Sequence, residues 1–396
     1  MDMVRSFTNH DDGLRTGTVL VVTPGGLEHG GGIGRQMGYF LQACQATQQK
    51  LSYRVVDSRG PWYLGASPLH VAGAVVYFGR AALIMLWARL FSSPCVAHVN
   101  ITGRGSTIRK VILLTIARAI GLRYVLHLHD YDYIEYYRSR GTLLKRLIAT
   151  MFRCAATVVM LGRRDLEVVS QSLQLHRDHV IVLHNAVPDP LPNLNRTPCA
   201  EKPCHLLFLG YLSARKGVPD LLQALATPTM KLRRWRATLA GGGPIAEFRK
   251  FAGDLGILDR LCFPGWLDQV GVSALYADAD VLVLPSHAEG LAMSVLEGLS
   301  HGLAVVTTPV GAHLEVIEPD VSGILVPPGD VAALADALVS VIEDETLRRR
   351  LARGARDRFL EGFNVRGYAA RLRQLHAGLL TPQHNQSEPV GKEQIS

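Results

Sequence analysis

The sequence of 396 residues lacks the patterns that mark several protein classes. Its six cysteines form no C-x-x-C pair and have no histidine cluster beside them, which argues against a zinc module and against a disulfide framework. The most apolar stretch, residues 71–91, is interrupted by Arg80 and Arg89, so its charge-free runs are shorter than the ~18 residues expected of a membrane span. The polar segment 1–17 contains no apolar signal core. We therefore expect a cytoplasmic protein with reduced thiols.

The chain has an ordinary globular composition with an uneven distribution of charge. Hydrophobic residues make up 48% and charged residues 19% of the sequence, which excludes a largely disordered chain. The formal net charge is +8, but residues 1–188 hold 21 basic and 11 acidic side chains, whereas residues 189–396 hold 21 and 23. An anionic partner, such as a nucleic acid, phosphates or a membrane surface, is therefore expected at the N-terminal half.

Apolar β-branched runs alternate with helical patterns along the chain, which predicts parallel sheets covered by helices. The expected strands of a first series lie at 18–23, 53–56, 95–99, 124–129, 157–161 and 180–183. The segment 188–203 contains five prolines and no apolar period, which is typical of a linker. A second series of strands follows at 205–209, 236–240, 260–263, 281–284, 304–307 and 323–326.

These patterns predict an α/β protein with two Rossmann-like domains that face each other across a cleft. The expected divisions are a flexible lead-in at 1–17, a first domain at 18–188, a linker at 189–203, a second domain at 204–362, a C-terminal helix at 363–380 that returns to the first domain, and a flexible tail at 381–396. Open α/β sheets bind ligands at the carboxyl ends of their strands, so the cleft is the expected site.

The most informative segment is 284–311, LPSHAEGLAMSVLEGLSHGLAVVTTPVG. An expected strand runs into a loop with Glu289, and a helix that starts near Leu291 carries Glu297 about two turns later. Free amides at the start of such a helix suit a diphosphate, and a helical carboxylate suits the hydroxyls of a ribose. The alternative is an ordinary helix with surface carboxylates. The amides expected to be free belong to Ala292, Met293 and Ser294.

Two further segments point to phosphate chemistry. In LLFLGYLSARKGVPDLL (206–222), a strand ends near Gly210 and a loop presents Arg215 and Lys216, which can clamp phosphates or can form a solvated turn. The glycine-rich loop PGGLEHGGGIGR (24–35) allows close approach of an anion to the backbone, but it lacks a clean G-x-G-x-x-G pattern.

Together these segments resemble the retaining glycosyltransferases of family 4, which have the two-Rossmann GT-B fold. The resemblance covers roughly residues 18–375 and is most specific in DADVLVLPS, EGLAMSVLE, HGLAVVTTPVGAHLEVI and GILVPPGD. LGYLSARKGV and LAGGGP support it, and GGGIGR, VLHLHD and VLHNAVP stand where the family has a phosphate loop, an active-site histidine and a strand-end Asn.

The resemblance implies a role for each matching residue. His129 and Glu289 lie beside the transferred sugar as the catalytic residues, although His129 has the alternative of a buried structural imidazole. The resemblance also implies that Gly32 and Lys216 bind the donor diphosphate, that Glu297 binds the ribose and that Leu267 lies near the base. The motifs themselves add Arg215 and the amides of Ala292, Met293 and Ser294 to the donor site. Departures from the family pattern are Tyr211 in place of an Arg, and Ala186 and Ala292 in place of glycines.

No cofactor is expected besides the nucleotide-sugar donor, GDP-mannose or UDP-glucose. Two D-x-D pairs occur, at 130–132 and 278–280, but the second precedes a strand instead of following one, and no required metal is expected. In the family the leaving diphosphate is thought to deprotonate the acceptor on the same face, so catalysis is mainly positioning and stabilisation of charge.

The segment 98–129 resembles members that build bacterial surface polysaccharides, where R-G-S-x-x-R-K precedes the H-x-H strand. The implied acceptor is a saccharide linked to a polyprenyl diphosphate, with Arg104 and Lys110 as candidates for its phosphates. The apolar helix 70–91, together with GPWYLG at 60–65, has the character of an interfacial anchor, or packs against its own sheet.

The sequence thus predicts a hexosyltransferase of exopolysaccharide biosynthesis that works at the inner face of the plasma membrane. The partners expected are a nucleotide sugar, a lipid-linked saccharide and an anionic membrane surface. A nucleotide-sugar epimerase on the same fold is an alternative. A nucleic-acid-binding protein is a further alternative, although the basic residues form no recognisable module.

Overall fold

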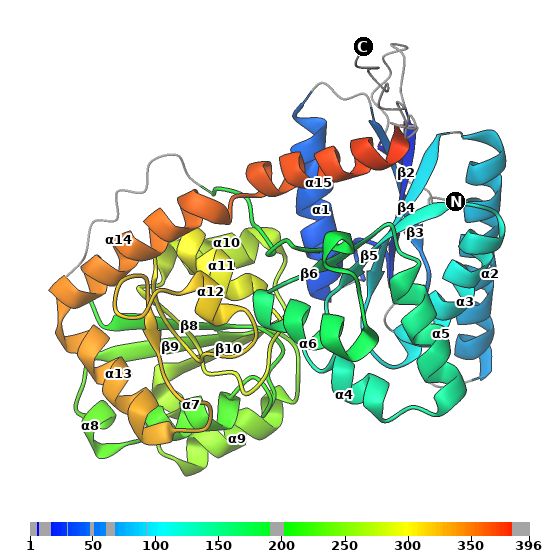
Figure 1. Ribbon diagram of the computed structural model, residues 1–396. Coiled ribbons are helices and arrows are strands. Elements are labelled where there is room, and N and C mark those ends of the chain that lie inside the picture. Colours follow the sequence, from blue (N-terminus) through cyan, green and yellow to red (C-terminus); the bar gives the residue numbers. More distant parts are fainter. Residues whose placement is uncertain are drawn as a thin grey trace, which may run out of the picture.

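The computed structural model describes residues 6–7, 17–29, 31–47, 51–60, 68–92, 94–190 and 202–381. Figure 1 shows two α/β domains side by side, with each sheet between layers of helices. The prediction of an α/β protein with two parallel-sheet domains is confirmed. Residues 61–67, 191–201 and 382–396 lie outside the described residues, and with them most of the GPWYLG segment, of the linker and of the C-terminal tail.

The first domain is built on a sheet with the order β1-β3-β2-β4-β5-β6-β7. All neighbouring strands are parallel except β1, which pairs antiparallel with the edge of β3 inside the segment expected as a flexible lead-in. An unpaired edge strand is a ready template for such an addition. The strands are β1 (Ser6–Phe7), β2 (Gly17–Thr23), β3 (Leu51–Asp57), β4 (Cys95–Ile101), β5 (Arg123–Leu128), β6 (Thr157–Met160) and β7 (Val180–Val182).

Both faces of this sheet are buried under helices. Side chains alternate between the two faces along each strand, so the central strands contribute to two core clusters. In β2, Val19 and Val21 pack with one core cluster and Leu20 and Val22 with the other. The helices are α1 (Gly31–Gln45), α2 (Pro68–Phe91), α3 (Gly105–Ala119), α4 (Tyr133–Arg138), α5 (Thr142–Arg153) and α6 (Arg163–Leu173), with a short 3₁₀ turn at Arg177–His179.

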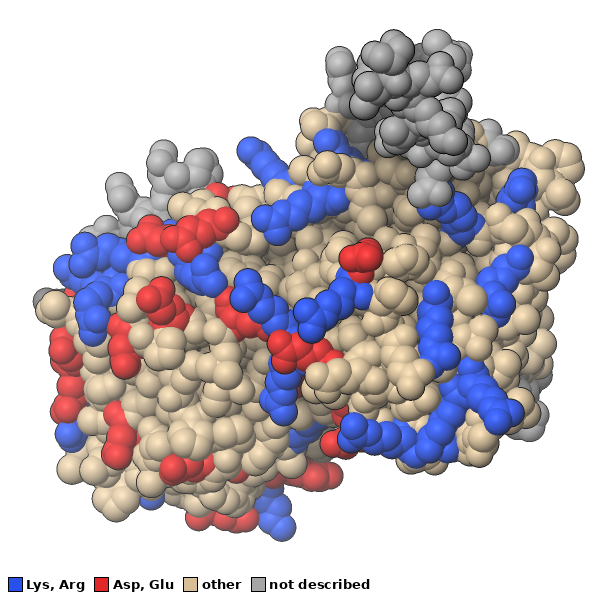
Figure 2. Space-filling model, in the orientation of Figure 1, with Lys and Arg blue, Asp and Glu red and all other residues tan. Residues whose placement is uncertain are grey.

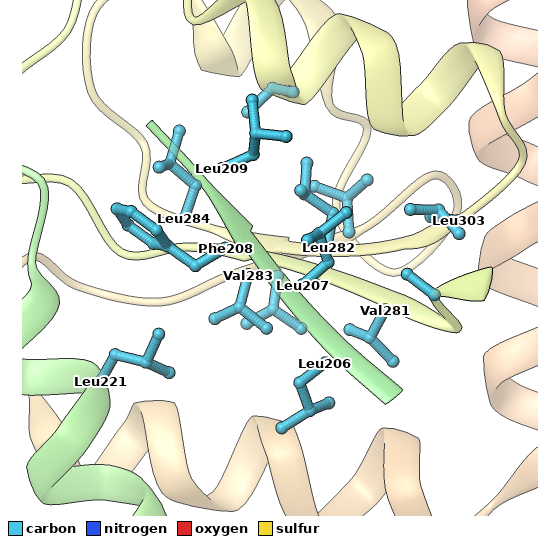
Figure 3. Packing of buried hydrophobic residues seen from close by; sticks show 14 of the residues in the cluster. Leu206, Leu207, Phe208, Leu209, Leu221, Val281, Leu282, Val283, Leu284 and Leu303 are labelled. Atoms are coloured by element: carbon cyan, nitrogen blue, oxygen red, sulfur yellow. The ribbon is translucent and has the colours of Figure 1, made fainter. Parts of the chain in front are cut away.

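The second domain has a fully parallel sheet with the order β10-β9-β8-β11-β12-β13. Its central strands are completely buried and mostly aliphatic, and Figure 3 shows Leu206, Leu207, Val281 and Leu282 packed together in its core. The strands are β8 (Cys204–Leu209), β9 (Trp235–Ala240), β10 (Leu261–Gly265), β11 (Val281–Leu284), β12 (Ala304–Thr307) and β13 (Ile324–Leu325).

The C-terminal helices connect the two domains. After α14 (Glu345–Gly362), the chain crosses to the first domain, where α15 (Val365–Leu380) packs against α1, β4 and β2 (Figure 1). Val187 and Asn364 form a parallel bridge at the crossing. The other helices are α7 (Val218–Leu225), α8 (Pro228–Lys231), α9 (Ile245–Asp254), α10 (Gln269–Asp278), α11 (Met293–Ser300), α12 (His313–Val316) and α13 (Val331–Glu343), with a 3₁₀ turn at Leu258–Arg260.

The strand order of each sheet predicts where a ligand binds in each domain. In the second sheet, β9 lies on one side of β8 and β11 on the other, so the chain switches direction between β8 and β11. In the first sheet the same switch occurs between β2 and β4. Ligand crevices of open α/β sheets lie outside the carboxyl ends of the strands at such points.

Candidate active site

The loop after β8 and the loop after β11 meet at the switch point of the second sheet. Lys216 Nζ lies 2.6 Å from Glu289 Oε1, and Arg215 Nη1 lies 3.1 Å from the same oxygen. The Lys216 and Glu289 side chains are only 12% and 10% exposed. Arg215 also donates to Ala288 O at 2.6 Å and lies over the ring of Tyr131 in the first domain. Two cations therefore converge on one carboxylate at the domain interface.

The conformation of the Lys216 loop depends on its next residue. Gly217 has φ 72°, and a Cβ there would lie 2.0 Å from the carbonyl oxygen of Pro285. Only glycine permits this close approach of the two loops. The amide of His287 donates to Arg215 O at 2.8 Å and joins the loops a second time. Lys216 and Glu289 are thus held together by backbone contacts as well as by their charges.

The start of α11 differs from the sequence prediction in two respects. The helix begins at Met293, so Glu297 lies one turn into it instead of two. The amide of Ala292, expected to be free, donates to the buried His313 Nε2 at 3.4 Å. His313 is a neutral acceptor, because burial lowers its pKa. Ala292 itself has φ −70° and ψ 125°, a conformation that alanine adopts without strain, which explains how it replaces glycine here.

Glu297 is buried between the two domains and accepts three hydrogen bonds. Tyr276 of its own domain donates to Oε2 at 2.9 Å. From helix α1 of the other domain, Tyr39 donates to Oε1 at 3.2 Å and Arg35 at 3.3 Å. Burial raises the pKa of both Tyr39 and Tyr276, so both phenols are donors at neutral pH. We call the contact of Arg35 and Tyr39 with Glu297 the α1 latch.

The N-termini of α1 and α11 lie next to each other across the interface. Gly32 is in the first turn of α1, and a Cβ on it would lie 3.9 Å from Met293 Cγ at the start of α11. Helix N-termini carry partial positive charge and unpaired amides. Together with Lys216, the arrangement offers an anion a cationic environment made by both domains.

His129 follows β5 and reaches the same interface from the first domain. Its Nε2 lies 2.8 Å from Asn100 Oδ1, and its backbone oxygen is 3.8 Å from the position that a Cβ on Gly290 would take. Burial and the neighbouring His98 lower the pKa of His129 to about 3, so the imidazole is neutral. The structure therefore brings His129 close to the Glu289 loop, as the family resemblance implies.

The two candidate acceptor residues have different surroundings. Arg104 is exposed and lines a pocket of about 550 Å³ on the first domain, which Tyr136, Arg140, Asp132 and Glu135 also line. Lys110, in contrast, is completely buried, and its ammonium contacts the hydroxyl of Ser58. Burial lowers its pKa to about 7. The expectation that Lys110 binds a phosphate of the acceptor is wrong, because its side chain is buried inside the domain.

The remaining sequence candidates have these positions. Leu267 is half-buried against the second core, next to Asp268, which caps α10. Tyr211 is 63% exposed, and Arg215 is the cation that accompanies Lys216. Asp278 and Asp280 of the second D-x-D pair hold His205. Within the described ranges, no group of three or more His, Cys, Asp or Glu side chains is arranged to hold a metal ion.

Sequence reasoning missed Arg35, Tyr39, Tyr276 and His313. Arg35 and Tyr39 stand four residues apart after the glycine-rich loop and therefore share one face of a helix, a spacing that could have identified them as a pair. Their partner Glu297 lies more than 250 residues away in the chain. Only the docking of the domains brings them together.

Comparison with known proteins places the second domain in a family. Residues 193–358 match the family described as "Glycosyl transferases group 1". The chain is 26% identical over 277 residues to alpha-D-kanosaminyltransferase of Streptomyces kanamyceticus, which covers 65% of this chain and 70% of that protein. It is 30% identical over 288 residues to 2-deoxystreptamine N-acetyl-D-glucosaminyltransferase of Streptomyces fradiae, with 66% of each chain covered.

Other curated relatives match over a shorter region. Phosphatidyl-myo-inositol mannosyltransferase of Mycobacterium leprae is 35% identical over 153 residues. That match covers 38% of this chain, and the chain spans about two fifths of that relative's length.

Solved structures share the fold over nearly the whole chain. Sucrose-phosphate synthase from Thermosynechococcus elongatus matches with a TM-score of 0.71 and 18% identity, covering 92% of this chain and 99% of that one. Anabaena HepE in complex with UDP-glucose matches with a TM-score of 0.68 and 17% identity, covering 91% and 100%. The architecture is that of the GT-B glycosyltransferases.

Proposed function

We propose that this chain, whose second domain is a glycosyl transferases group 1 domain, is a retaining hexosyltransferase that uses a nucleotide-sugar donor and a polyprenyl-diphosphate-linked saccharide as acceptor. The observation that carries the proposal is the convergence of Lys216, Arg215 and two helix N-termini at the interface, with Glu297 and His129 beside them. Such a site combines cations for a diphosphate with a carboxylate for vicinal hydroxyls.

In the proposed reaction, the bond from the anomeric carbon to the diphosphate oxygen breaks and negative charge grows on the leaving diphosphate. Lys216, Arg215 and the amides at the start of α11 stabilise that charge. The departing diphosphate oxygen takes the proton of the acceptor hydroxyl, which bonds to the anomeric carbon from the same face. Glu289 and His129 hold the hexose in place, so the main contributions are positioning and charge.

The donor is proposed to be UDP-glucose or GDP-mannose, with neither a metal nor another cofactor. HepE, which shares the fold, is described in complex with UDP-glucose, and the relative from Mycobacterium leprae is described as a mannosyltransferase. A carboxylate such as Glu297 accepts from ribose hydroxyls whatever the base is. The base and the sugar therefore have to be identified by assay.

The acceptor site is proposed in the first domain, where basic side chains predominate. On the face shown in Figure 2, the region around α4 and α5 displays mainly Lys and Arg, whereas the second domain displays both signs. Arg104 and Arg140 line the pocket described above. Arginine binds phosphate oxygens in bidentate geometry, which suits a lipid-linked diphosphate.

Helix α2 is the proposed membrane contact. Its residues Ala72–Phe91 are long and apolar enough to cross a membrane by length and composition, and 17% of the most apolar window is buried. One side, with Ala81 and Met85, packs on the domain, while Leu90 is 64% and Phe91 70% exposed. An apolar face with Arg80 and Arg89 beside it suits the surface of an anionic bilayer. We propose a peripheral, cytoplasmic-face location.

Substitution of Leu90 and Phe91 by serine together is expected to weaken binding to vesicles that contain anionic lipid by at least tenfold. Both side chains are largely exposed, so the folded state loses little and the melting temperature stays within a few degrees of the wild type. Vesicle sedimentation measures the binding. Leu232→Ser, at a 79% exposed position in the second domain, is the matched control. Equal binding of the double variant and the wild type would contradict membrane docking through α2.

The function is tested by incubating the protein with UDP-glucose, GDP-mannose and related donors, with and without a lipid extract. Release of the nucleoside diphosphate that depends on the extract, with a lipid-linked product whose new linkage keeps the anomeric configuration of the donor, is expected. Interconversion of donor sugars without acceptor would instead identify an epimerase. Absence of both donor binding and donor turnover would reject the proposal.

In the free protein, the α1 latch occupies the carboxylate of Glu297 and is therefore expected to compete with the ribose of the donor. Tyr39→Phe removes one hydrogen bond to Glu297 that a bound ribose has to displace, so donor affinity is expected to rise roughly two- to tenfold, the size of one hydrogen bond. Titration calorimetry with UDP and GDP measures it, with Tyr137→Phe in the first domain as the control. Weaker binding by Tyr39→Phe would mean that the phenol contacts the donor itself.

A further inference from the structure

Three buried imidazoles, one partly buried imidazole and one phenol form a continuous chain across the first domain. His98 and Asn100 lie on β4, His127 lies on β5, and His129 directly follows β5. His98 and Asn100 are two residues apart, as are His127 and His129, so the side chains of each pair point to the same face of the sheet. This is the face that α1 and α15 cover. From α15, His376 packs on the same face, and Tyr53 of β3 completes the row.

The contacts follow one another in order from α15 toward the active site. Tyr53 Oη lies 3.3 Å from His376 Nδ1, and His376 Nε2 lies 3.1 Å from His98 Nδ1. His98 Nε2 lies 3.3 Å from His127 Nδ1. The His127 ring then stacks on the ring of His129, with centroids 4.0 Å apart and planes tilted by 33°. We call this row the histidine chain.

All members of the histidine chain are neutral at physiological pH. Burial lowers the pKa of His98 to about 4 and the pKa values of His127 and His376 far below their usual range. In a contact between two neutral imidazole nitrogens, one carries the proton and the other accepts it. The tautomers along the chain are therefore coupled: the choice made at Tyr53 and His376 determines those of His98 and His127.

His127 shows that the arrangement has a cost. Its Nε2 is buried and has no hydrogen-bond partner. A buried polar nitrogen without a partner destabilises the fold unless other contacts hold it in place. The ring of His127 is held by His98 on one side and serves as the flat support of His129 on the other. A purely apolar core would have filled this position with an aliphatic residue at no such cost.

Asn100 fixes the tautomer of His129. The amide group of Asn100 donates to Val22 O at 3.3 Å, so its Oδ1 is the atom that faces His129. His129 Nε2 therefore carries the proton and donates it to Oδ1. Its Nδ1 is left as an acceptor, which is the form needed to receive a hydrogen bond from a sugar hydroxyl.

We propose that the histidine chain, through the stacking of His127 on His129, sets the ring orientation of His129 while Asn100 sets its tautomer, so that His376 and Tyr53 act as positioning residues of the active site from the far side of the domain. Helix α15, which follows the second domain in the chain, therefore helps to position the active-site residue that the first domain contributes. The proposal rests on the proposed function for the role of His129, but the coupling along the chain can be observed without turnover.

The test combines imidazole ¹⁵N chemical shifts, which report the tautomer and the hydrogen bonding of each ring, with kinetics on two variants. Tyr53→Phe removes only the phenolic oxygen at the start of the chain, and His376→Phe removes both nitrogens of the next member. Each is expected to shift the ¹⁵N signals of His127 and His129 and to lower kcat roughly fivefold to tenfold, as for the loss of one hydrogen bond. The donor KM is expected to stay within twofold, and His376→Gln is expected to recover part of kcat.

Tyr368→Phe, at a buried position of the same helix outside the chain, is the control and is expected to leave the His129 signals unchanged. Unchanged His127 and His129 signals in folded Tyr53→Phe would overturn the proposal, whatever the activity. If His376→Phe does not fold, Tyr53→Phe alone decides. Shifted signals in a protein that has no glycosyl transfer activity would support the chain and reject the proposed function, so the two failures are distinguishable.

Discussion

Lys216→Ala is expected to lower turnover by about 10²- to 10³-fold, the usual cost of removing one preorganised donor from a developing anion. The ammonium lies at the switch point of the second sheet, is almost buried, and is held there by its Glu289 contact and by the close approach of Gly217 to Pro285. In a partly desolvated site its charge acts more strongly on a diphosphate than it would in water. Donor affinity is expected to fall in parallel.

Two comparisons separate this effect from a loss of structure. Lys231→Ala, at an exposed position on α8 of the same domain, should retain full activity. Lys216→Arg keeps the charge but not the compact ammonium, and partial activity is expected. Arg215 remains near Glu289 in all three variants, so the carboxylate keeps a cationic partner. Lys216→Ala with near-native turnover and near-native affinity for inorganic pyrophosphate would reject the assignment of the diphosphate site.

The architecture could be predicted from the sequence because the signals that define it are local. Buried parallel strands are short apolar runs, and β11 and β12 have the predicted bounds, 281–284 and 304–307. The C-terminal helix expected at 363–380 corresponds to α15, which packs against α1 of the first domain. Among the strands in the described part of the chain, only the two-residue β1 has no predicted counterpart, because two residues are too few for any periodicity.

The site could be predicted only where one motif contained it. Glu289 and Glu297 belong to one segment, whereas the partners of Glu297 on α1 depend on how the domains dock. Lys110 shows the opposite error: the basic segment predicts a phosphate ligand at this position, but Lys110 lies on the inward face of α3, where it is buried against Ser58. Charge patterns predict the sign of a surface and not the direction of one side chain.

Glu297→Ala is expected to weaken the binding of nucleoside diphosphates on the order of a hundredfold, because a carboxylate that accepts from ribose hydroxyls contributes a charge-assisted hydrogen bond to each. The contribution of Glu297 to binding is partly offset, because in the free protein its carboxylate already accepts hydrogen bonds from Arg35, Tyr39 and Tyr276. The fold is expected to survive, since Tyr276 also donates to Ser294 O at 3.2 Å and the half-exposed Arg35 can turn to solvent.

The choice of ligand makes this prediction specific. Glu297→Ala should bind inorganic pyrophosphate as the wild type does, whereas Lys216→Ala should bind it much more weakly, because Lys216 is assigned to the phosphates and Glu297 is assigned to the ribose. The wild type should prefer UDP over 2′-deoxy-UDP, and Glu297→Ala should bind both equally weakly. Glu318→Ala, at an exposed position of the same domain, is the control. If Glu297→Ala still discriminated between the two nucleotides, the ribose would have to be bound elsewhere, and the α1 latch would lose its meaning as a competitor of the donor.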